Sequence, residues 1–414
     1  MKILHVNASD IIGGAARAAH RIHMAQVRAG MDSHMLVLRR NEPATRIHAP
    51  LSRPAQLIQR LKLAGAEKLL TKQYSPTNPT LHSINYFRSH LSSWINDSDF
   101  DIVNLHWLGL ETLSIEEIGC IRQPVVWTMH DMWPFSGAEH YDDIDYPGRY
   151  RTGYTSATRP EGHLGLDIDA WVWRRKRSAW KDSNFQLISP SQWLAECARS
   201  STLMARHPCA VIPNCIDTEI FKPIDRRLAR YILNLSPEKQ YILFGAIAST
   251  NDRRKGFHLL HPALQQLAQY PCISQNTELI VFGANEPTST IETGLPTHYM
   301  GHLNDDVSLA VLYAAADLFV APSMQDNLPN TVAEAMASGT PCVAFSIGGM
   351  TDMIDHGVTG LLVPPFEIPL LSEAIYRMLQ EPPSRDAVRQ AALSRHRPMA
   401  VAHAYQAVYT QVHR

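Results

Sequence analysis

The sequence lacks the features that mark several common classes of protein. It has no surplus of charge, because 38 lysines and arginines stand against 39 aspartates and glutamates, giving a formal net charge of −1. A nucleic-acid-binding domain usually carries a basic face, so this balance argues against such a partner. The six cysteines are scattered and form no Cys-x-x-Cys pair. This pattern favours reduced thiols over disulfides or a cysteine zinc site.

Long hydrophobic runs are also missing. No apolar stretch approaches the roughly 18–20 residues of a membrane-spanning helix, and Met1–Val6 resembles a buried strand rather than a secretory signal. We therefore expect a cytoplasmic protein. Leu51–Tyr74 has the pattern of a basic amphipathic helix, which either lies on the inner face of the membrane or simply presents a solvated face.

Short runs rich in valine, isoleucine and leucine are present throughout, each followed by a helical pattern. They do not alternate with polar residues, which is typical of parallel strands buried on both faces. Since 414 residues exceed one ordinary core, two sets of such runs predict an α/β protein with two doubly wound domains. The first set is Ile3–Val6, Met35–Leu38, Ile102–Leu105, Val125–Met129 and Phe185–Ile188, and the second is Tyr241–Phe244, Leu279–Phe282, Asp317–Ala321, Cys342–Phe345 and Leu361–Val363.

The division between the domains is predicted close to Pro208. We assign residues 1–207 to an N-terminal domain and 208–386 to a C-terminal domain, and we expect residues 387–414 to form a helix that packs back on the first. The segment Glu139–Leu166 is polar and rich in glycine and tyrosine, so it is predicted to be a long surface loop.

The most informative motif is Ala321–Gly339, a strand end followed by a short helix. Asp326 and Glu334 are separated by seven residues across that helix start. Backbone N–H groups and the positive end of the helix dipole suit a phosphate or a sugar hydroxyl there. Thr331 and Glu334 also fit a capping box, in which the glutamate only satisfies the helix end. The spacing alone leaves both interpretations open.

A second motif, Asn251–Phe257, places three cations, Arg253, Arg254 and Lys255, after a strand. Fixed cations stabilise a departing diphosphate, arginine through bidentate hydrogen bonds and lysine as a point charge. Three adjacent cations in a loop are also typical of a solvated face.

Polar pairs follow the strands of the N-terminal half. Gly13-Gly14 precedes Arg17 and would let a ligand approach a helix start, or would simply form a tight turn. His130-Asp131 can polarise a ligand or accept a proton, or can merely anchor a loop. His106 lies at a similar strand end.

Together these motifs resemble the retaining glycosyltransferases of family four. Asp326-x7-Glu334 resembles the family's E-x7-E signature, and His356–Val363 resembles its closing segment. Trp127–Pro134 and Asn327–Thr331 are especially similar to the bacterial exopolysaccharide subgroup. The resemblance implies the GT-B fold, in which two Rossmann-like domains face each other across a cleft. It also implies a nucleotide-sugar donor on the C-terminal domain, an acceptor on the N-terminal domain and retention at the anomeric carbon.

The resemblance also implies roles for individual residues. The expected catalytic residues are His130, Asp326, Lys255 and Arg254. The expected donor-binding residues are Gly14, Arg253, Arg254, Lys255, Asp326, Asn327, Leu328, Pro329, Asn330, Thr331 and Glu334, with Glu334 on the ribose. The expected acceptor-binding residues are Arg17, His106 and Asp131. Two departures stand out: Asp326 replaces the usual glutamate, and Thr250 stands where the family often has its arginine, so that role passes to Arg254, with Arg253 as the substitute.

The expected reaction moves a sugar from a nucleotide donor, UDP-linked by preference, to a saccharide or lipid-linked oligosaccharide acceptor in the synthesis of exopolysaccharide or another surface glycan. No metal or other cofactor is expected, because the cations replace it and the pairs Asp142-Asp143 and Asp305-Asp306 lie outside the motifs. Two alternatives stay open. A GT-B phosphorylase would need a lysine for pyridoxal phosphate, and a bilobal sugar-binding protein would not need the three cations.

Overall fold

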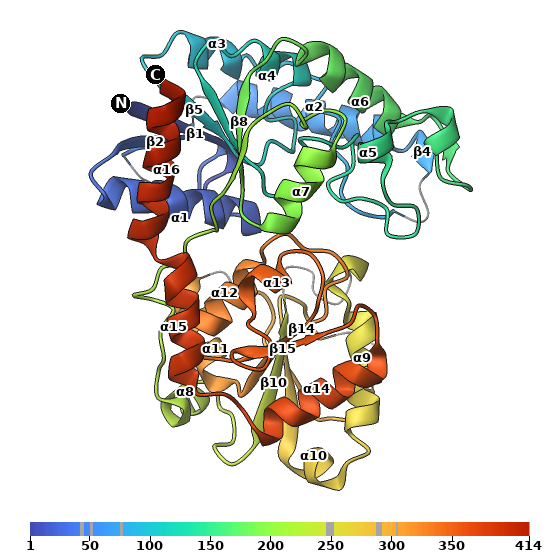
Figure 1. Ribbon diagram of the computed structural model, residues 1–414, viewed down its shortest axis with the longest axis vertical. Helices are drawn as coiled ribbons and strands as arrows, with labels where there is room; N and C mark the ends of the chain where they lie inside the picture. Colours follow the sequence, from blue (N-terminus) through green and yellow to red (C-terminus); the bar gives the residue numbers. More distant parts are fainter. Residues whose placement is uncertain are drawn as a thin grey trace. The chain divides into compact units, whose positions relative to one another are not determined.

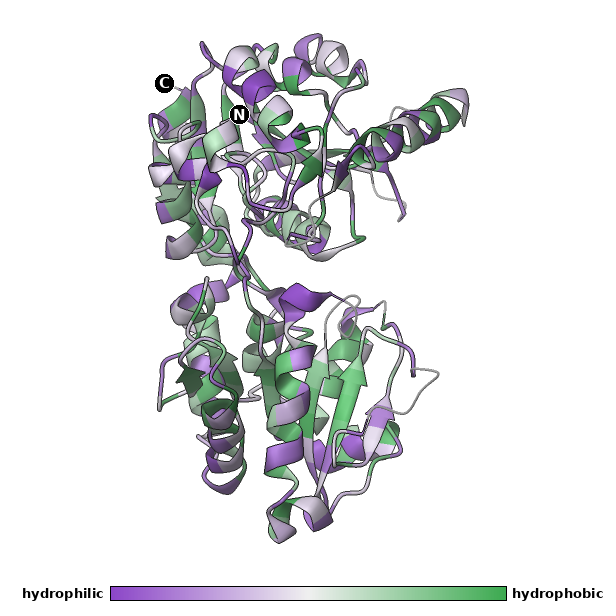
Figure 2. Cartoon of the chain, turned by 90° about the vertical axis from the view of Figure 1, so that its right-hand side faces the viewer, coloured by the Kyte–Doolittle hydropathy of each residue, from purple (hydrophilic) through white to green (hydrophobic). Residues whose placement is uncertain are grey.

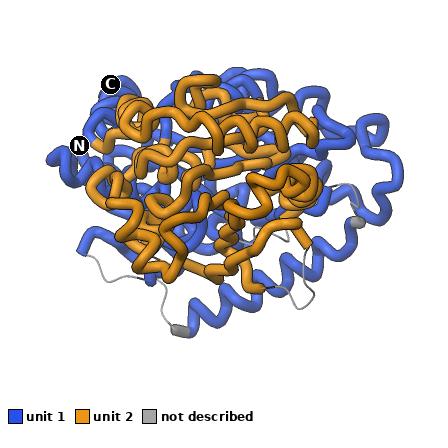
Figure 3. Tube along the Cα trace, turned by 90° about the horizontal axis from the view of Figure 1, so that it is seen from below, with its two compact units in different colours: residues 1–213, 399–414 blue, residues 214–398 orange. Residues whose placement is uncertain are grey.

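The chain is described by a computed structural model that covers residues 1–41, 45–49, 53–74, 78–245, 252–286, 292–303 and 305–413. It divides into two compact units, one formed by Met1–Pro213 with Met399–Arg414 and the other by Asn214–Pro398 (Figure 3). Each unit contains a parallel sheet covered by helices (Figure 1). The predicted α/β architecture with two Rossmann-like units is therefore present.

The first unit is built on a seven-stranded sheet with the order β3-β2-β1-β5-β6-β8-β9, in which every neighbouring pair is parallel. The order reverses between β1 and β5, which places a ligand-binding switch point at their carboxyl ends. The strands are β1 (Lys2–Ser9), β2 (Asp32–Arg39), β3 (Ile47–His48), β5 (Ile102–Leu105), β6 (Val125–Thr128), β8 (Phe185–Ser189) and β9 (Cys209–Val211).

Helices connect these strands. They are α1 (Gly14–Arg28), α2 (Arg53–Leu70), α3 (Leu91–Asn96), α4 (Ile115–Gly119), α5 (Arg149–Thr152), α6 (Ile168–Ala179) and α7 (Gln192–Ser200), with a 3₁₀ turn η1 (Ser156–Thr158). A separate antiparallel pair joins β4 (Gln73–Tyr74) to β7 (Leu164–Gly165). Among the described helices of the chain, none is both long and apolar enough to cross a membrane.

The second unit has a six-stranded parallel sheet with the order β12-β11-β10-β13-β14-β15, and its order reverses between β10 and β13. Its strands are β10 (Gln240–Gly245), β11 (Thr277–Phe282), β12 (Thr297–Tyr299), β13 (Leu318–Ala321), β14 (Cys342–Phe345) and β15 (Gly360–Val363). Most of their residues are buried, and Figure 2 shows these strands as hydrophobic.

Helices cover both faces of this second sheet, which explains why its strands lack polar alternation. One core packs α9 (Phe257–Leu267) and α14 (Ile368–Gln380) on one face. The other core packs α8 (Arg226–Ile232), α11 (Asp306–Ala315), α12 (Asn330–Ala337) and α15 (Arg385–His396). Short helices α10 (Pro271–Asn276) and α13 (Met350–Met353) and the 3₁₀ turn η2 (Arg253–Lys255) complete the unit.

The unit boundaries differ from those predicted. Strand β9 extends the first sheet beside β8, so the division falls after Pro213 and not after residue 207. Residues 387–414 do not form one returning helix: α15 stays in the second unit, and only α16 (Pro398–His413) joins the first. Arg397 is extended, because a residue before proline is disfavoured in helical conformation.

The predicted surface loop 139–166 is more structured than expected. It contains α5, η1 and β7, and both Tyr150 and Tyr154 are buried in the core of the first unit. Sequence alone misses this because the buried aromatic side chains are separated by glycines and charged residues and show no regular period.

Candidate functional site

Two loops meet at the switch point of the second sheet, one after β10 and one after β13. Asp252 caps η2, since its Oδ1 accepts a hydrogen bond from the backbone N–H of Arg254 at 3.0 Å. The Met324 N–H donates to the Arg254 carbonyl at 2.8 Å. Gly256 has φ +75°, and a Cβ there would lie 1.8 Å from the Pro322 oxygen. Only glycine allows this approach, so the fold holds the cationic loop against the start of the second motif.

The contact between these loops is a cluster of charges. Lys255 Nζ donates to Asp326 Oδ2 at 2.6 Å. Arg254 Nη1 lies 3.5 Å from the same carboxylate oxygen and donates to the Gln325 carbonyl at 2.9 Å. Burial opposes the charged form of Asp326, yet Lys255 and Arg254 outweigh it and hold the pKa of this carboxyl below its ordinary value. Burial also lowers the pKa of Lys255, and the charge of Asp326 opposes that shift. With both basic side chains protonated, the cluster holds two cations and one anion.

The structure distinguishes the roles of Arg253 and Arg254, which the sequence alone left open. Arg254 is half-buried beside Lys255 and Asp326, whereas Arg253 is exposed. Thr250, the position compared with the family's usual arginine, lies outside the described residues.

Glu334 does not cap its helix. Helix α12 begins at Asn330 after Pro329 and has no side-chain capping hydrogen bond, so the capping-box interpretation of Thr331 and Glu334 is wrong. Glu334 is instead 2% exposed, and its Oε2 accepts a hydrogen bond from the Tyr313 hydroxyl at 3.0 Å. A buried, oriented carboxylate is suited to vicinal hydroxyl groups.

The segment between the two acidic residues is held mainly through its backbone. The Asp326 carbonyl accepts from Gly349 N–H at 3.1 Å, and a Cβ on Gly348 would lie 2.1 Å from that carbonyl oxygen. Leu328 belongs to the hydrophobic core. The Asn330 amide oxygen accepts from Asn214 at 3.3 Å. Asn327 and Pro329 are buried and Thr331 is half-buried, and the Asn327 N–H donates to Asp326 Oδ1 at 3.1 Å.

In the first unit, a line of histidines runs inward from the end of β6. His130 Nε2 lies 2.9 Å from His106 Nδ1, and His106 Nε2 lies 2.8 Å from His5 Nδ1. His5 Nε2 then lies 2.9 Å from the Gln26 amide oxygen. Gln26 donates in turn to the Tyr409 hydroxyl on α16 at 3.1 Å. The structure thus brings together two predicted residues, His130 and His106, and adds His5, Gln26 and Tyr409.

The direction of this hydrogen-bond chain follows from its chemistry. Burial lowers the pKa of His5 and of His130 to about 4, and it lowers the pKa of His106 well below its ordinary value. Each ring is therefore neutral near pH 7 and carries one N–H. Since the Gln26 oxygen can only accept, every ring donates inward through Nε2. His130 consequently carries its lone pair on Nδ1.

The remaining predicted residues of the first unit lie at or near strand ends. Gly14 is the exposed first residue of α1, just after Gly13 with φ +98°, and Arg17 is half-buried in the same turn. Asp131 bonds to neighbouring side chains: its Oδ2 accepts from His140 Nδ1 at 2.6 Å and from Trp107 Nε1 at 2.9 Å. These contacts orient the carboxylate, and its acceptor-binding role stays a prediction.

Comparison with solved structures identifies this architecture. Sucrose-phosphate synthase from Thermosynechococcus elongatus matches with a TM-score of 0.66 at 18% identity, covering 100% of this chain and 99% of that one. The structure of Anabaena HepE in complex with UDP-glucose matches with a TM-score of 0.61 at 16% identity, covering 99% of this chain and 100% of that one. Together with the two doubly wound units, they define the fold class: the protein has the GT-B fold.

The family models and relatives are more specific. Residues 12–220 match the model described as Glycosyltransferase Family 4, and residues 239–381 match Glycosyl transferases group 1. The phosphatidyl-myo-inositol mannosyltransferase of Mycobacterium leprae is 26% identical over 364 residues, covering 86% of this chain and 84% of the relative. The chain belongs to glycosyltransferase family 4. This confirms the predicted family, fold and enzyme class, while the exopolysaccharide subgroup stays a prediction.

Proposed function

We propose that this glycosyltransferase takes its sugar from a nucleoside diphosphate donor, UDP-linked by preference, and transfers it to a saccharide acceptor with retention at the anomeric carbon. The observation that carries this proposal is the charge cluster of Lys255, Arg254 and Asp326 at the switch point of the second sheet. It lies where doubly wound sheets bind phosphate-containing ligands.

The cluster can stabilise a departing diphosphate. Asp326 orients Lys255 through a 2.6 Å ion pair, and Arg254 adds a second cation that is fixed by the Gln325 carbonyl. When the bond from the anomeric carbon to the phosphate oxygen breaks, negative charge grows on that oxygen, and cations held in place lower the barrier. These side chains supply the charge that a divalent metal supplies elsewhere, so we propose turnover without a metal.

Retention follows if the acceptor approaches on the face that the diphosphate leaves. The acceptor hydroxyl oxygen then forms the new bond to the anomeric carbon, and its proton passes to an oxygen of the departing phosphate. No protein nucleophile is required. We assign the ribose hydroxyls to Glu334 because its carboxylate is buried and already oriented by Tyr313. The donor sugar is assigned to Asp326 and to the backbone amides that follow it.

The relatives support this choice of donor and acceptor. HepE was solved with UDP-glucose, and the name of the Mycobacterium leprae relative specifies a lipid acceptor and mannose. A GDP-sugar is therefore the donor to compare with UDP-sugars. Helix α2 exposes Leu57, Ile58 and Leu61 by 60%, 52% and 66%, which supports a lipid-linked acceptor reached by peripheral contact with a membrane.

A binding and turnover experiment tests the proposal. UDP-, GDP- and ADP-sugars are compared in EDTA for protection against thermal unfolding and then for transfer, with the anomeric configuration of the product read by NMR. Lys255→Ala should lower donor affinity by about 10- to 100-fold, as expected for the loss of a hydrogen bond to a charged group. Arg253→Ala removes a charge from the neighbouring exposed position and should change little.

Three results would contradict the proposal: full activity of Lys255→Ala, abolition of wild-type transfer by EDTA at a temperature where the protein stays folded, or inversion at the anomeric carbon. Turnover that depends on orthophosphate would instead indicate a phosphorylase. Donor protection without any transfer would indicate a sugar-binding protein.

A further inference from the structure

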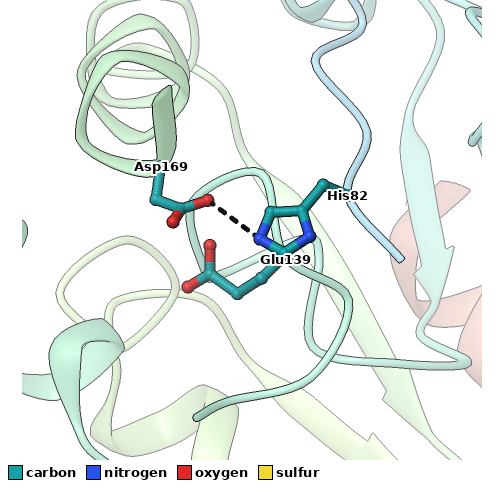
Figure 4. A group of neighbouring side chains, drawn as sticks. All are labelled: His82, Glu139 and Asp169. Carbon is teal, nitrogen blue, oxygen red and sulfur yellow. Dashed lines mark ion pairs between the residues drawn. The ribbon is translucent and has the colours of Figure 1, made fainter. Parts of the chain in front are cut away.

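Three ionisable side chains from distant parts of the first unit converge on one point (Figure 4). His82 lies between β4 and α3, Glu139 follows β6, and Asp169 stands in the first turn of α6. One ligand atom from each lies within 4.8 Å of the other two. The His82 side chain is 12% exposed, while Glu139 and Asp169 are 4% and 5% exposed.

The converging atoms are the ones that the described residues leave without a hydrogen bond. They are His82 Nε2, Glu139 Oε2 and Asp169 Oδ1. Buried polar atoms in native proteins almost always have a partner, so three orphaned atoms aimed at one point indicate that a ligand belongs there. Gly137 leaves room for them, because a Cβ at that position would lie 2.6 Å from Glu139 Oε2.

Each of the three side chains is oriented by a bond at its other end. The Tyr154 hydroxyl donates to Glu139 Oε1, and the Gln73 amide donates to Asp169 Oδ2 at 2.7 Å. His82 Nδ1 lies 2.7 Å from the Thr80 carbonyl, which can only accept, so Nδ1 donates this bond and, in the neutral ring, Nε2 keeps its lone pair for a ligand. Metal-binding histidines and carboxylates are held in this way by partners on their outer side.

The charges of the group require a cation or a proton. His82 Nε2 lies 3.5 Å from Asp169 Oδ1, which is unfavourable for a neutral ring beside a carboxylate unless a proton or a metal cation stands between the two atoms. The nearby ammonium of Lys176 makes its hydrogen bonds to the carbonyls of Trp133, Ser136 and Gly137, so it gives the carboxylates no direct bond. Burial and the charge of Asp169 raise the pKa of Glu139 well above its ordinary value.

We propose that His82, Glu139 and Asp169 bind a divalent transition-metal ion, with Zn²⁺ as the best fit, and that this ion cross-links three segments of the first unit. One imidazole and two carboxylates match the ligands of Zn²⁺, which takes four, so a water molecule completes the set. One of the three proposed ligands, His82, lines a cavity of about 460 Å³. The ion has a structural role, which is separate from the metal-independent transfer proposed above.

Zinc binding to the purified full-length chain tests this proposal. The protein is stripped with EDTA, dialysed and titrated with Zn²⁺ at pH 8, and bound metal is measured by elemental analysis beside the thermal unfolding temperature. We expect about one zinc per chain, as a single set of ligands implies, and a rise in the unfolding temperature. Glu139→Gln and Asp169→Asn should weaken zinc binding more than about tenfold. Asp145→Asn, an exposed change in the same segment, should bind like the wild type.

A second measurement needs no variant. Co²⁺ should give d–d absorption bands of a four-coordinate site without a thiolate band. Absence of zinc binding and of any stabilisation at pH 8 would overturn the proposal and leave a shared proton between Glu139 and Asp169. Zinc binding that survives in both carboxylate variants would place the ion elsewhere.

Discussion

At the scale of single residues, a substitution of Glu334 can test whether this side chain binds the donor or only supports the fold. Its side chain is buried and bonded to Tyr313. In Glu334→Gln the amide oxygen can still accept the bond from Tyr313, but the charge that strengthens bonds to ribose hydroxyls is lost. We expect the affinity for free UDP to fall about tenfold, or by roughly 1.4 kcal/mol, with little change in unfolding temperature. Calorimetric titration decides this, and unchanged affinity would exclude the ligand role.

Asp142 makes stability depend on pH. Burial raises its pKa to about 7, although its Oδ2 accepts a 2.7 Å bond from Gly148 N–H. The unfolded aspartate has a pKa of about 3.9, so between the two pKa values the folded protein binds a proton that the unfolded chain lacks. The free energy of unfolding of the wild type therefore falls as the pH rises through 7. Asp142→Asn keeps an acceptor for Gly148 and carries no charge. Between pH 5 and 8, its free energy of unfolding should gain roughly 2–3 kcal/mol relative to wild type in urea titrations. A constant difference across that range would contradict the prediction.

At this scale, the sequence predicted candidate site residues only where a charged or polar side chain follows an apolar strand. His130 and Asp326 closely follow the predicted strands β6 and β13, and Lys255 lies in η2 in the connection after β10, where it contacts Asp326. The choice between Arg253 and Arg254 depends on how η2 turns, which local patterns do not specify. The sequence also contained an unused indication of the histidine line. His5 lies within a buried strand, where a histidine must find polar partners.

At the scale of elements, α16 acts as a polar anchor for the histidine line. The Tyr409 hydroxyl accepts from Gln26 at 3.1 Å and from Asn104 at 2.7 Å. Tyr409→Phe leaves two buried amide donors without an acceptor, at about 1–3 kcal/mol each, and should reduce the free energy of unfolding accordingly.

The same substitution tests the direction of the histidine line. In the wild type, ¹⁵N NMR should show the proton of His130 on Nε2, and Tyr409→Phe should allow both tautomers. Thr410→Ala, at an exposed position on the same helix, serves as the control and should leave both readouts unchanged. A wild-type His130 that carries its proton on Nδ1 would reverse the inferred direction.

Element types were predictable where burial is uniform. The predicted strand runs coincide with β1, β2, β5, β6 and β8 and with β10, β11, β13, β14 and β15. The strands β3 and β12 were missed, because two or three residues at a sheet edge carry no pattern. The break between α15 and α16 depends on which unit each helix packs against, and a continuous helical pattern does not reveal that.

At the scale of the whole molecule, a net charge near zero hides a local basic surface on α2. Arg60, Lys62 and Lys68 share this helix with the exposed Leu57 and Leu61. We expect sedimentation with anionic vesicles at low salt and release at high salt, since each basic residue near the surface contributes about 1 kcal/mol. Neutral vesicles are the control. Protein that stays in the supernatant with anionic vesicles at low salt would favour a soluble acceptor.

The chain passes between the units twice, after Pro213 and again at Pro398, and this has a consequence during synthesis. The second unit is one continuous segment that is complete once residue 398 has left the ribosome. The first unit must wait for α16, whose Val401, Ala402, Tyr405 and Tyr409 fill its interior. Although domains generally mature from the N-terminus, here the unit that is made first is finished last. A ribosome halted at residue 398 should therefore carry a protease-resistant second unit beside a protease-sensitive first one.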